Sequence, residues 1–340
     1  MSFIFEAIYI INLDKDVKRW KQVMQQIKQF NKPVTRVPAV DASKLDKKTI
    51  ENITSDICAK FCTKTMIACA ASHIKAWKTF LQTSLSHILI CEDDVEFASN
   101  SHQLLPNMMK QIPKDFDLVW IGCNDCQYHK NEYAWSSNGL HFLLRLTSNL
   151  PKENKIISNN VYIPKIALGT HCYMLSRKGA EQLLKHVDKI SFHIDTTLST
   201  LIPHLKMYAL HPKLATQKCL LYSSTIATGK YPQFLNSYAD SIVNKDGTSL
   251  AYILSLPVGQ IGHFKINGWS FFAILLGVIY SSNLINPNYK QLLLYVLVLV
   301  FIVADLFYSI NVQTLFDMFS FVCTFLITVI GFSGIKSIQF

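Results

Sequence analysis

The stretch His87-Ile88-Leu89-Ile90-Cys91-Glu92-Asp93-Asp94-Val95-Glu96-Phe97 decides the fold, because an apolar run leads directly into three adjacent carboxylates. The run from Ile88 to Cys91 is typical of a strand buried on both faces of a sheet that helices cover. Like charges at the end of such a strand repel each other and lose hydration, so something must neutralise them. A divalent cation would do so, and clustered carboxylates suit Mg²⁺ or Mn²⁺. A polar strand end with solvated acids is an equally good interpretation of this stretch alone.

The composition divides the chain into a basic part and an apolar tail. The 340 residues carry a formal net charge of +10, and the charged residues after position 267 cancel. The excess of positive charge therefore lies in residues 1–267. A basic domain favours anionic lipid surfaces, nucleic acid or phosphorylated substrates. Since the chain has no Arg-rich run and no interleaving of aromatic and basic residues, no nucleic-acid partner is expected.

Nine cysteines occur without regular spacing. The close pairs are Cys58/Cys62 and Cys123/Cys126, and His129 would make the second pair an incomplete zinc set. An odd number of cysteines without a repeating pattern favours reduced, buried thiols and a reducing compartment. The N-terminal residues lack the pattern of a signal peptide, so none is expected.

Hydrophobic periodicity predicts alternating strands and helices in the basic part of the chain. Strands are expected at residues 7–13, 34–41, 88–91, 116–122, 169–176 and 207–210, and helices at 17–30, 68–83, 101–111 and 179–186. Residues 42–65 are predicted to be irregular. Residues 123–166 are predicted to form a long loop, of the kind that often serves as a binding loop or lid.

Polar residues at the predicted strand ends are the candidate ligand-binding groups. Asn12 and Leu13 end the first strand before a helix, whose free N–H groups suit phosphate, although an ordinary strand–helix unit explains them better. Asp41 ends the second strand, where an acid can bind a ribose or cap a turn. His211 follows the last strand. Asp195 begins a helix, where its alternative role is a cap.

The residues after position 267 predict a membrane tail. Leu292–Ile310 and Met318–Ile335 approach the roughly 20 apolar residues that a membrane span needs. Trp269–Ile285 is marginal, and is either a short span or an interfacial helix. None of these segments has the polar face of a buried helical domain. Lys and Arg are enriched before the tail, so the large domain is expected on the cytoplasmic side of the membrane.

Six sequence blocks carry a family resemblance. They are Ile10-Ile11-Asn12-Leu13-Asp14 with Arg19, Pro38-Ala39-Val40-Asp41, Ala68-Cys69-Ala70-Ala71-Ser72-His73-Ile74-Lys75-Ala76-Trp77, Ile88-Leu89-Ile90-Cys91-Glu92-Asp93-Asp94-Val95, Gly169-Thr170-His171-Cys172-Tyr173-Met174-Leu175-Ser176-Arg177-Lys178-Gly179-Ala180 and Ile194-Asp195. In this order, over about residues 6–215, they resemble glycosyltransferase family 25, which includes bacterial lipooligosaccharide and animal procollagen galactosyltransferases. Ala68 and Cys91 depart from the commoner family residues, but neither change removes a catalytic group.

The resemblance implies an α/β fold of the GT-A type, a nucleotide-binding domain with a mixed sheet, over residues 1–216. An extension at 217–267 and a tail at 268–340 with two or three transmembrane helices would follow. The implied activity is transfer of a hexose, galactose or glucose, from a UDP-sugar to an acceptor hydroxyl, with inversion and with Mn²⁺ or Mg²⁺ bound. The acceptor would be a glycan, a lipid-linked sugar or a protein.

The same resemblance suggests roles for single residues. Glu92 and Asp94, with His211 as a third ligand, would hold the metal ion, which acts as Lewis acid toward the departing diphosphate. Asp195 is the candidate general base facing the acceptor hydroxyl, and Asp93 and Glu96 are its alternatives. The expected donor-binding residues are Asn12, Leu13, Arg19, Asp41, Ser72 and His73. For a His on a mostly apolar helix, core packing is the alternative role.

Two other functions are compatible with the sequence. One is a catalytically inactive, membrane-anchored binding protein of the same fold, against which the intact triplet Glu92-Asp93-Asp94 argues. The other is a different Mg²⁺-dependent phosphotransferase or nuclease, against which the lack of a Gly-rich phosphate loop argues.

Overall fold

A computed structural model describes residues 5–129, 133, 135–217, 250–262, 264–282, 289–290 and 321–331. The chain divides into two compact units. The larger comprises residues 1–59 and 64–222, and the smaller comprises residues 60–63 and 223–340.

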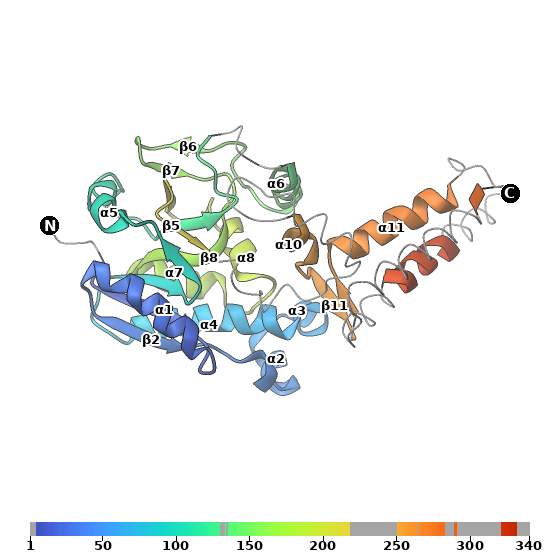
Figure 1. Ribbon diagram of the computed structural model, residues 1–340, viewed down its shortest axis with the longest axis horizontal. Coiled ribbons are helices and arrows are strands. Elements are labelled where there is room, and N and C mark those ends of the chain that lie inside the picture. The colour runs from blue at the N-terminus through green and yellow to red at the C-terminus, as the bar shows by residue number, and fades with distance from the viewer. Residues whose placement is uncertain are drawn as a thin grey trace. The chain divides into compact units, whose positions relative to one another are not determined.

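The larger unit is built on an eight-stranded mixed sheet (Figure 1). Its strands are β1 (Ala7–Asn12), β2 (Val34–Pro38), β3 (His87–Glu92), β5 (Leu118–Asn124), β6 (Lys155–Ile156), β7 (Val161–Ile163), β8 (Leu168–Ser176) and β9 (Met207–Leu210). The strand order is β2-β1-β3-β8-β5-β9-β7-β6. Strand β1 pairs in parallel with β2 and β3, while β8 lies antiparallel between β3 and β5. The carboxyl ends of β1, β3, β5 and β9 therefore meet the start of β8 at one edge.

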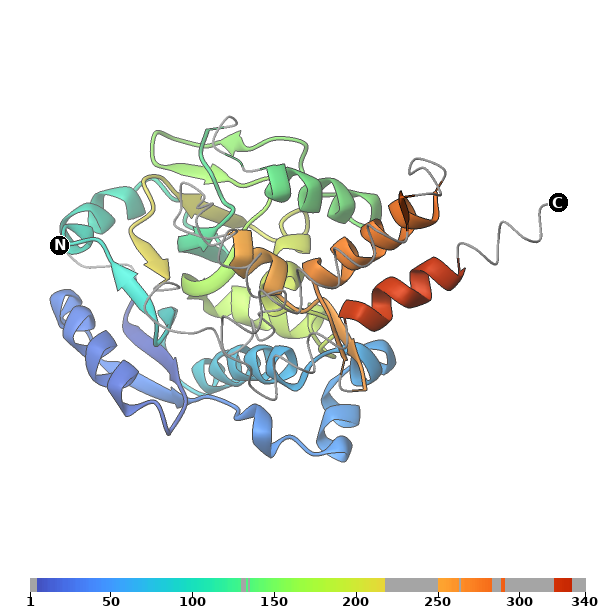
Figure 2. The ribbon, with the colours of Figure 1, turned by 45° about the vertical axis from the view of Figure 1, so that its right-hand side comes forward.

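Helices cover both faces of this sheet. The helices described between residues 17 and 200 are α1 (Val17–Ile27), α2 (Lys47–Ile53), α3 (Asp56–Phe61), α4 (Lys64–Leu81), α5 (Ser101–Met109), α6 (Trp135–Thr147), α7 (Arg177–His186) and α8 (Ile194–Thr200). Buried residues of α1 and α5 join one apolar cluster with β1, β3 and β8. Helix α4 packs with α7, α8 and β1, and Figures 1 and 2 both show it beside the yellow-green helices of residues 177–200.

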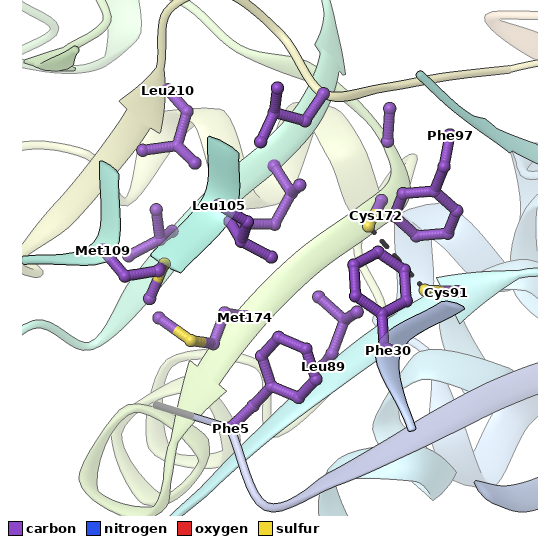
Figure 3. Packing of buried hydrophobic residues seen from close by; sticks show 14 of the residues in the cluster. Phe5, Phe30, Leu89, Cys91, Phe97, Leu105, Met109, Cys172, Met174 and Leu210 are labelled. Carbon is purple, nitrogen blue, oxygen red and sulfur yellow. Dashed lines mark hydrogen bonds between the residues drawn. The ribbon is translucent and has the colours of Figure 1, made fainter. Parts of the chain in front are cut away.

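The side chains of β3 alternate between these two faces. Leu89 and Cys91 belong to the cluster with α1 and α5, and Figure 3 shows Cys91 opposite Cys172 of β8. Glu92 points to the other face, where it contacts His73 of α4. Period-two alternation thus places Glu92 toward α4, and both faces of β3 are buried as the apolar run predicts.

The start of α7 shows why one glycine is required. Ser176 caps the helix as predicted, since its Oγ accepts the N–H of Gly179 at 2.9 Å. A Cβ on Gly179 would lie 2.1 Å from the carbonyl oxygen of Asp117, which directly precedes β5. Only a residue without a side chain allows this close approach of helix and backbone.

The strands and helices predicted between residues 7 and 210 are confirmed, with boundaries shifted by a few residues. Two predictions of irregular structure are wrong. Residues 42–65 contain α2, α3 and the start of α4, and residues 123–166 contain α6, β6 and β7. The side chain of Asp46 caps α2 by accepting the N–H of Thr49 at 2.7 Å. Helices α2 and α3 bury few apolar residues and so leave little periodicity to detect. On α6, Phe142, Leu143 and Leu146 are exposed, so they do not mark a buried stripe.

The prediction of reduced thiols is wrong for four cysteines, because Cys58, Cys62, Cys123 and Cys126 are all disulfide-bonded. Cys123 and Cys126 form a disulfide across 5.8 Å between their Cα atoms. Because the two sulfurs bond to each other, they are not ligands of a zinc site. Cys91 and Cys172 are free and buried between β3 and β8.

In the smaller unit, the structure describes a short helix, a hairpin and parts of the apolar tail. Its elements are α10 (Leu250–Ser255), the strands β11 (Gly259–Ile261) and β12 (Phe264–Ile266), and α11 (Gly268–Ser281). Among the helices described, none combines the length and apolar character needed to cross a membrane, and α11 has 14 residues. The predicted span at 292–310 lies outside the described residues, as do both ends of the span at 318–335. The described helices therefore do not support the predicted transmembrane tail.

Two glycine substitutions in helices are expected to have opposite effects on stability. Gly179→Ala should lower the free energy of unfolding by roughly 1–3 kcal/mol, because the new methyl group collides with the backbone of Asp117. Gly139→Ala in α6 meets nothing within 4 Å and should raise it by about 0.5–1 kcal/mol, because alanine favours helix. Chemical unfolding of the two variants measures both values. Equal effects in the two helices would contradict the proposed collision.

Candidate functional site

The acidic triplet lies at the carboxyl edge of the sheet, next to the end of β1. Strands β1 and β3 run in parallel with Ile11 opposite Glu92, so Asn12 and Asp93 follow at the same level. The side-chain amide of Asn12 donates a hydrogen bond of 2.6 Å to Asp93 Oδ2. The structure thus joins two predicted site residues that lie 81 positions apart in the sequence.

Two arginines bring positive charge to this edge. Arg19 Nη1 lies 3.3 Å from Asp93 Oδ1 and 4.0 Å from Asp94 Oδ2. Arg36 donates to Asn12 Oδ1 through Nε at 2.9 Å and Nη2 at 2.7 Å. Because Arg36 engages the amide oxygen of Asn12, the NH₂ group of Asn12 is directed to Asp93. Arg36 is a site residue that the sequence did not reveal, since it lies in the middle of a predicted strand.

Asp94 is the least compensated of the three acids. Its Oδ2 accepts a hydrogen bond of 3.0 Å from Gln217 Nε2, but within the described part of the chain its buried Oδ1 has no hydrogen-bond partner. Burial, followed by the charge of Glu92, raises the pKa of Asp94 to about 7. Burial also raises the pKa of Asp93, despite the opposing effects of Asn12 and Arg19. Asp94 is therefore suited to hold either a proton or a cation.

Gln217 is a second residue that the sequence did not reveal. It ends β10 (Ala215–Gln217), which pairs with β4 (Val95–Phe97), and it lies opposite Val95 in this pairing. Its Oε1 accepts a hydrogen bond of 3.4 Å from Asn124 at the end of β5. The pairing of β10 with β4 therefore delivers Gln217 to Asp94.

Glu92 is held by donors from two elements. Its Oε1 accepts a hydrogen bond of 2.7 Å from Thr170 of β8, and His73 Nε2 lies 3.4 Å from the same oxygen. Burial acts to raise the pKa of Glu92, but the contacts with His73 and Thr170 outweigh it and leave the pKa below its ordinary value. Glu92 is therefore an anion at neutral pH, in contrast to Asp94.

Asp195 begins α8 and is fixed by backbone donors. Its Oδ2 accepts the N–H of Gly169 at 3.3 Å, and its Oδ1 accepts the N–H of Thr196 at 2.6 Å. Gly169 has a φ of +78° at the start of β8, the strand next to β3. The contact between Asp195 and Gly169 therefore ties the start of α8 to the same sheet edge.

Cys69 of α4 connects Asp195 electrostatically with the triplet. Burial raises the pKa of the Cys69 thiol, and the charges of Glu92, Asp195 and Asp94 raise it further. The Cys69 thiol is thus close enough to all three carboxylates for their charges to raise its pKa.

His211 lies apart from the acids. It stacks on Tyr128 with ring centroids 4.2 Å apart and contacts His129 edge to face. Strands β8 and β5 separate β9 from β3, and three strand spacings correspond to roughly 14 Å. Among the described residues, no three acidic, imidazole or thiol groups lie close enough together to hold a metal ion. The predicted ligand set of Glu92, Asp94 and His211 is therefore not assembled in this structure.

The remaining predicted donor residues have local structural contacts. Asp41 accepts hydrogen bonds from the N–H of Ser43 at 3.0 Å and from its hydroxyl at 2.8 Å, which lower the pKa of Asp41. This is the capping role named as its alternative. Ser72 Oγ accepts the N–H of Val40 at 2.9 Å, and the carbonyl of Leu13 accepts the N–H of Asp16, the N-cap of α1. Their roles in donor binding stay predictions.

Comparisons with known proteins give a family. Residues 5–198 match the model of "Glycosyltransferase family 25 (LPS biosynthesis protein)". Human "Inactive glycosyltransferase 25 family member 3" is 25% identical over 129 residues, 35% of this chain and 22% of that protein. Mouse "Procollagen galactosyltransferase 2" is 26% identical over 141 residues, 38% of this chain and 23% of that protein. The chain thus spans under a quarter of the length of these relatives.

A solved structure was also matched, at low similarity. The apo form of mouse xyloside xylosyltransferase 1 is 8% identical, with a TM-score of 0.29 over 58% of this chain and 70% of that one. A match at this level carries no argument.

The raised pKa of Asp94 predicts a pH-dependent effect of its replacement. The folded chain keeps a proton on Asp94 up to about pH 7, whereas the unfolded chain releases it near its ordinary pKa of 3.8. Stability is therefore lost as the pH rises through this window. In EDTA at pH 8, Asp94→Asn should raise the free energy of unfolding by on the order of 1–3 kcal/mol, with a smaller gain at pH 5.

Urea unfolding at both pH values measures this difference. Glu96→Gln is the matched control, because Glu96 lies two residues further on and is exposed. It should leave stability almost unchanged at either pH. A gain from Asp94→Asn that is equal at pH 5 and pH 8 would show that Asp94 does not titrate in this range.

Proposed function

The chain belongs to glycosyltransferase family 25, and we propose that it transfers a hexose, galactose or glucose, from a UDP-sugar to an acceptor hydroxyl. The main support is the half-buried triplet Glu92-Asp93-Asp94 at the carboxyl edge of a mixed sheet, within the segment that matches the family. Ligands of open α/β sheets bind at such edges.

In this proposal Asp94 and Glu92 hold a divalent cation, Mn²⁺ or Mg²⁺. Two observations fit a cation: the buried Oδ1 of Asp94 has no hydrogen-bond partner among the described residues, and burial raises the pKa of this acid to about 7. Such ions often keep water and substrate phosphates as further ligands, so His211 is not required beside the two acids. When bound, the cation neutralises charge on the departing UDP.

In this proposal, side chains of the protein bind the diphosphate and accept the proton of the acceptor. Arg19 adds positive charge near the site of the diphosphate, and the Asn12–Asp93 hydrogen bond holds the ends of two strands in register. Asp195, held by the N–H of Gly169, accepts the proton of the attacking hydroxyl. An inverting displacement requires one such base on the face opposite the leaving group.

A catalytically inactive binding protein is the second candidate, because one similar human protein is named as an inactive member of this family. The complete acidic triplet supports the active alternative. The acceptor, which would be a glycan, a lipid-linked sugar or a protein, stays a prediction. So does membrane attachment, since residues 292–310 lie outside the described part of the chain.

Slow hydrolysis of UDP-sugars tests the donor and the metal together. The full chain should hydrolyse one sugar of a panel that includes UDP-galactose and UDP-glucose with Mn²⁺ but not with EDTA. Asp94→Asn should reduce this rate by roughly 100-fold or more, because it removes charge stabilisation from the leaving group. Asp188→Asn, at an exposed acid to which no role in the site is assigned, should keep the wild-type rate. UDP binding without hydrolysis would favour the inactive protein, and a folded chain that binds no UDP would exclude both candidates.

Replacement of Asp195 tests the proposed base. Asp195→Asn should lower kcat for donor hydrolysis by about 10²–10⁴-fold, because no carboxylate would accept the proton of the nucleophile. The Kd for UDP in the presence of Mn²⁺ should not change, since Asp195 does not contact the diphosphate in this proposal. Asp188→Asn, at an exposed acid of the same domain, is the control. An unchanged kcat in Asp195→Asn would direct the search to Asp93 and Glu96.

A further inference from the structure

A chain of buried hydrogen-bonding side chains ends on the acidic triplet. Trp77 Nε1 donates a hydrogen bond of 2.8 Å to the hydroxyl oxygen of Tyr173, and this hydroxyl lies 3.0 Å from His73 Nδ1. His73 Nε2 in turn lies 3.4 Å from Glu92 Oε1. Trp77, Tyr173 and His73 are each at most 1% exposed. Helix α4 and strand β8 thus contribute to one connected network.

The hydrogen-bonding capacity of each group indicates which one donates and which one accepts in this network. The indole of Trp77 can only donate, so the hydroxyl oxygen of Tyr173 must accept. The hydroxyl hydrogen of Tyr173 then has His73 Nδ1 as its acceptor in this network when that nitrogen carries no proton. In a neutral imidazole the proton consequently lies on Nε2, directed at Glu92. The opposite tautomer would leave the Tyr173 hydrogen buried without an acceptor in the network and turn a nitrogen lone pair toward the carboxylate.

We propose that Tyr173 is a positioning residue, which fixes the tautomer of His73 and thereby the orientation of Glu92. The inference rests on the proposed function, in which Glu92 serves the metal and the donor. Thr170 and His73 both reach Oε1, and within the described residues no hydrogen bond reaches Oε2. One oxygen of Glu92 is therefore held by the protein, while the other is left for a ligand.

Packing alone does not account for this arrangement. A buried indole N–H and a buried phenol need a partner, and the Trp77–Tyr173 pair satisfies that need by itself. The continuation through His73 to a carboxylate of the site gives the pair a consequence for binding. In metal sites, the groups that orient a ligand typically contribute 10–100-fold to metal affinity or activity.

The tautomer of His73 can be measured directly in the full-length protein. Long-range ¹H–¹⁵N correlation spectra of ¹⁵N-histidine-labelled protein distinguish the protonated from the unprotonated ring nitrogen, and His73→Gln assigns the signal by its loss. We expect Nε2 to be protonated and Nδ1 unprotonated in the wild type. In Tyr173→Phe we expect a mixture of tautomers or a change to Nδ1–H, because the hydroxyl that donates to Nδ1 is gone.

Kinetics provide the second measurement. Tyr173→Phe should weaken the apparent Mn²⁺ affinity in donor hydrolysis by about 10–100-fold. Tyr9→Phe is the matched control, because Tyr9 is a buried tyrosine of the same face that packs on Phe80 of α4. It should leave both the tautomer and the Mn²⁺ affinity unchanged.

The outcomes separate this inference from the proposed function. A wild-type His73 protonated on Nδ1 would overturn the inference even if Tyr173→Phe does not fold. An unchanged tautomer in a folded Tyr173→Phe would also overturn it. The expected tautomers in a full chain that hydrolyses no UDP-sugar would support the network and reject the proposed function.

Discussion

The structure of the site depends on how three adjacent carboxylates tolerate burial at the end of β3. Each is compensated in a different way. Glu92 receives hydrogen bonds from β8 and α4, and Asp93 receives an amide and a guanidinium from the first strand–helix unit. Asp94 receives one amide from Gln217, and its pKa is raised. The protein thus stabilises Glu92 as an anion, whereas Asp94 keeps a capacity for a cation or a proton.

The strand order makes these different compensations possible. Parallel pairing of β1 and β3 places Asn12 beside Asp93, since both strands end at the same edge. The antiparallel strand β8 inserts between β3 and β5 with its first residues at that edge, so Thr170 reaches Glu92. Alternation along β8 then directs Tyr173 toward α4 and Cys172 into the opposite core. One antiparallel strand in an otherwise parallel centre therefore supplies both a ligand-orienting group and core packing.

The sequence predicted the parts of this arrangement that local patterns encode. Apolar runs mark β1, β3 and β8, and the acids that follow β3 mark the edge where ligands bind. The sequence did not predict that Gln217 reaches Asp94, because this contact depends on the pairing of β10 with β4. It also placed His211 beside the acids, although β8 and β5 lie between β9 and β3. Strand order is set by long-range pairing, which no short stretch of sequence encodes.

The poor compensation of Asp94 bears on whether this edge of the sheet binds a charged ligand or only retains the fold. A buried acid with a raised pKa destabilises the folded state at neutral pH, and a neutral side chain of the same shape would relieve this cost. Such costs are typical of residues kept for function at the expense of stability. A protein that only retains the fold would have no physical use for the charge of Asp94. A protein that binds a cation and a diphosphate at this edge would need it, because the cation supplies the compensation that the chain itself lacks.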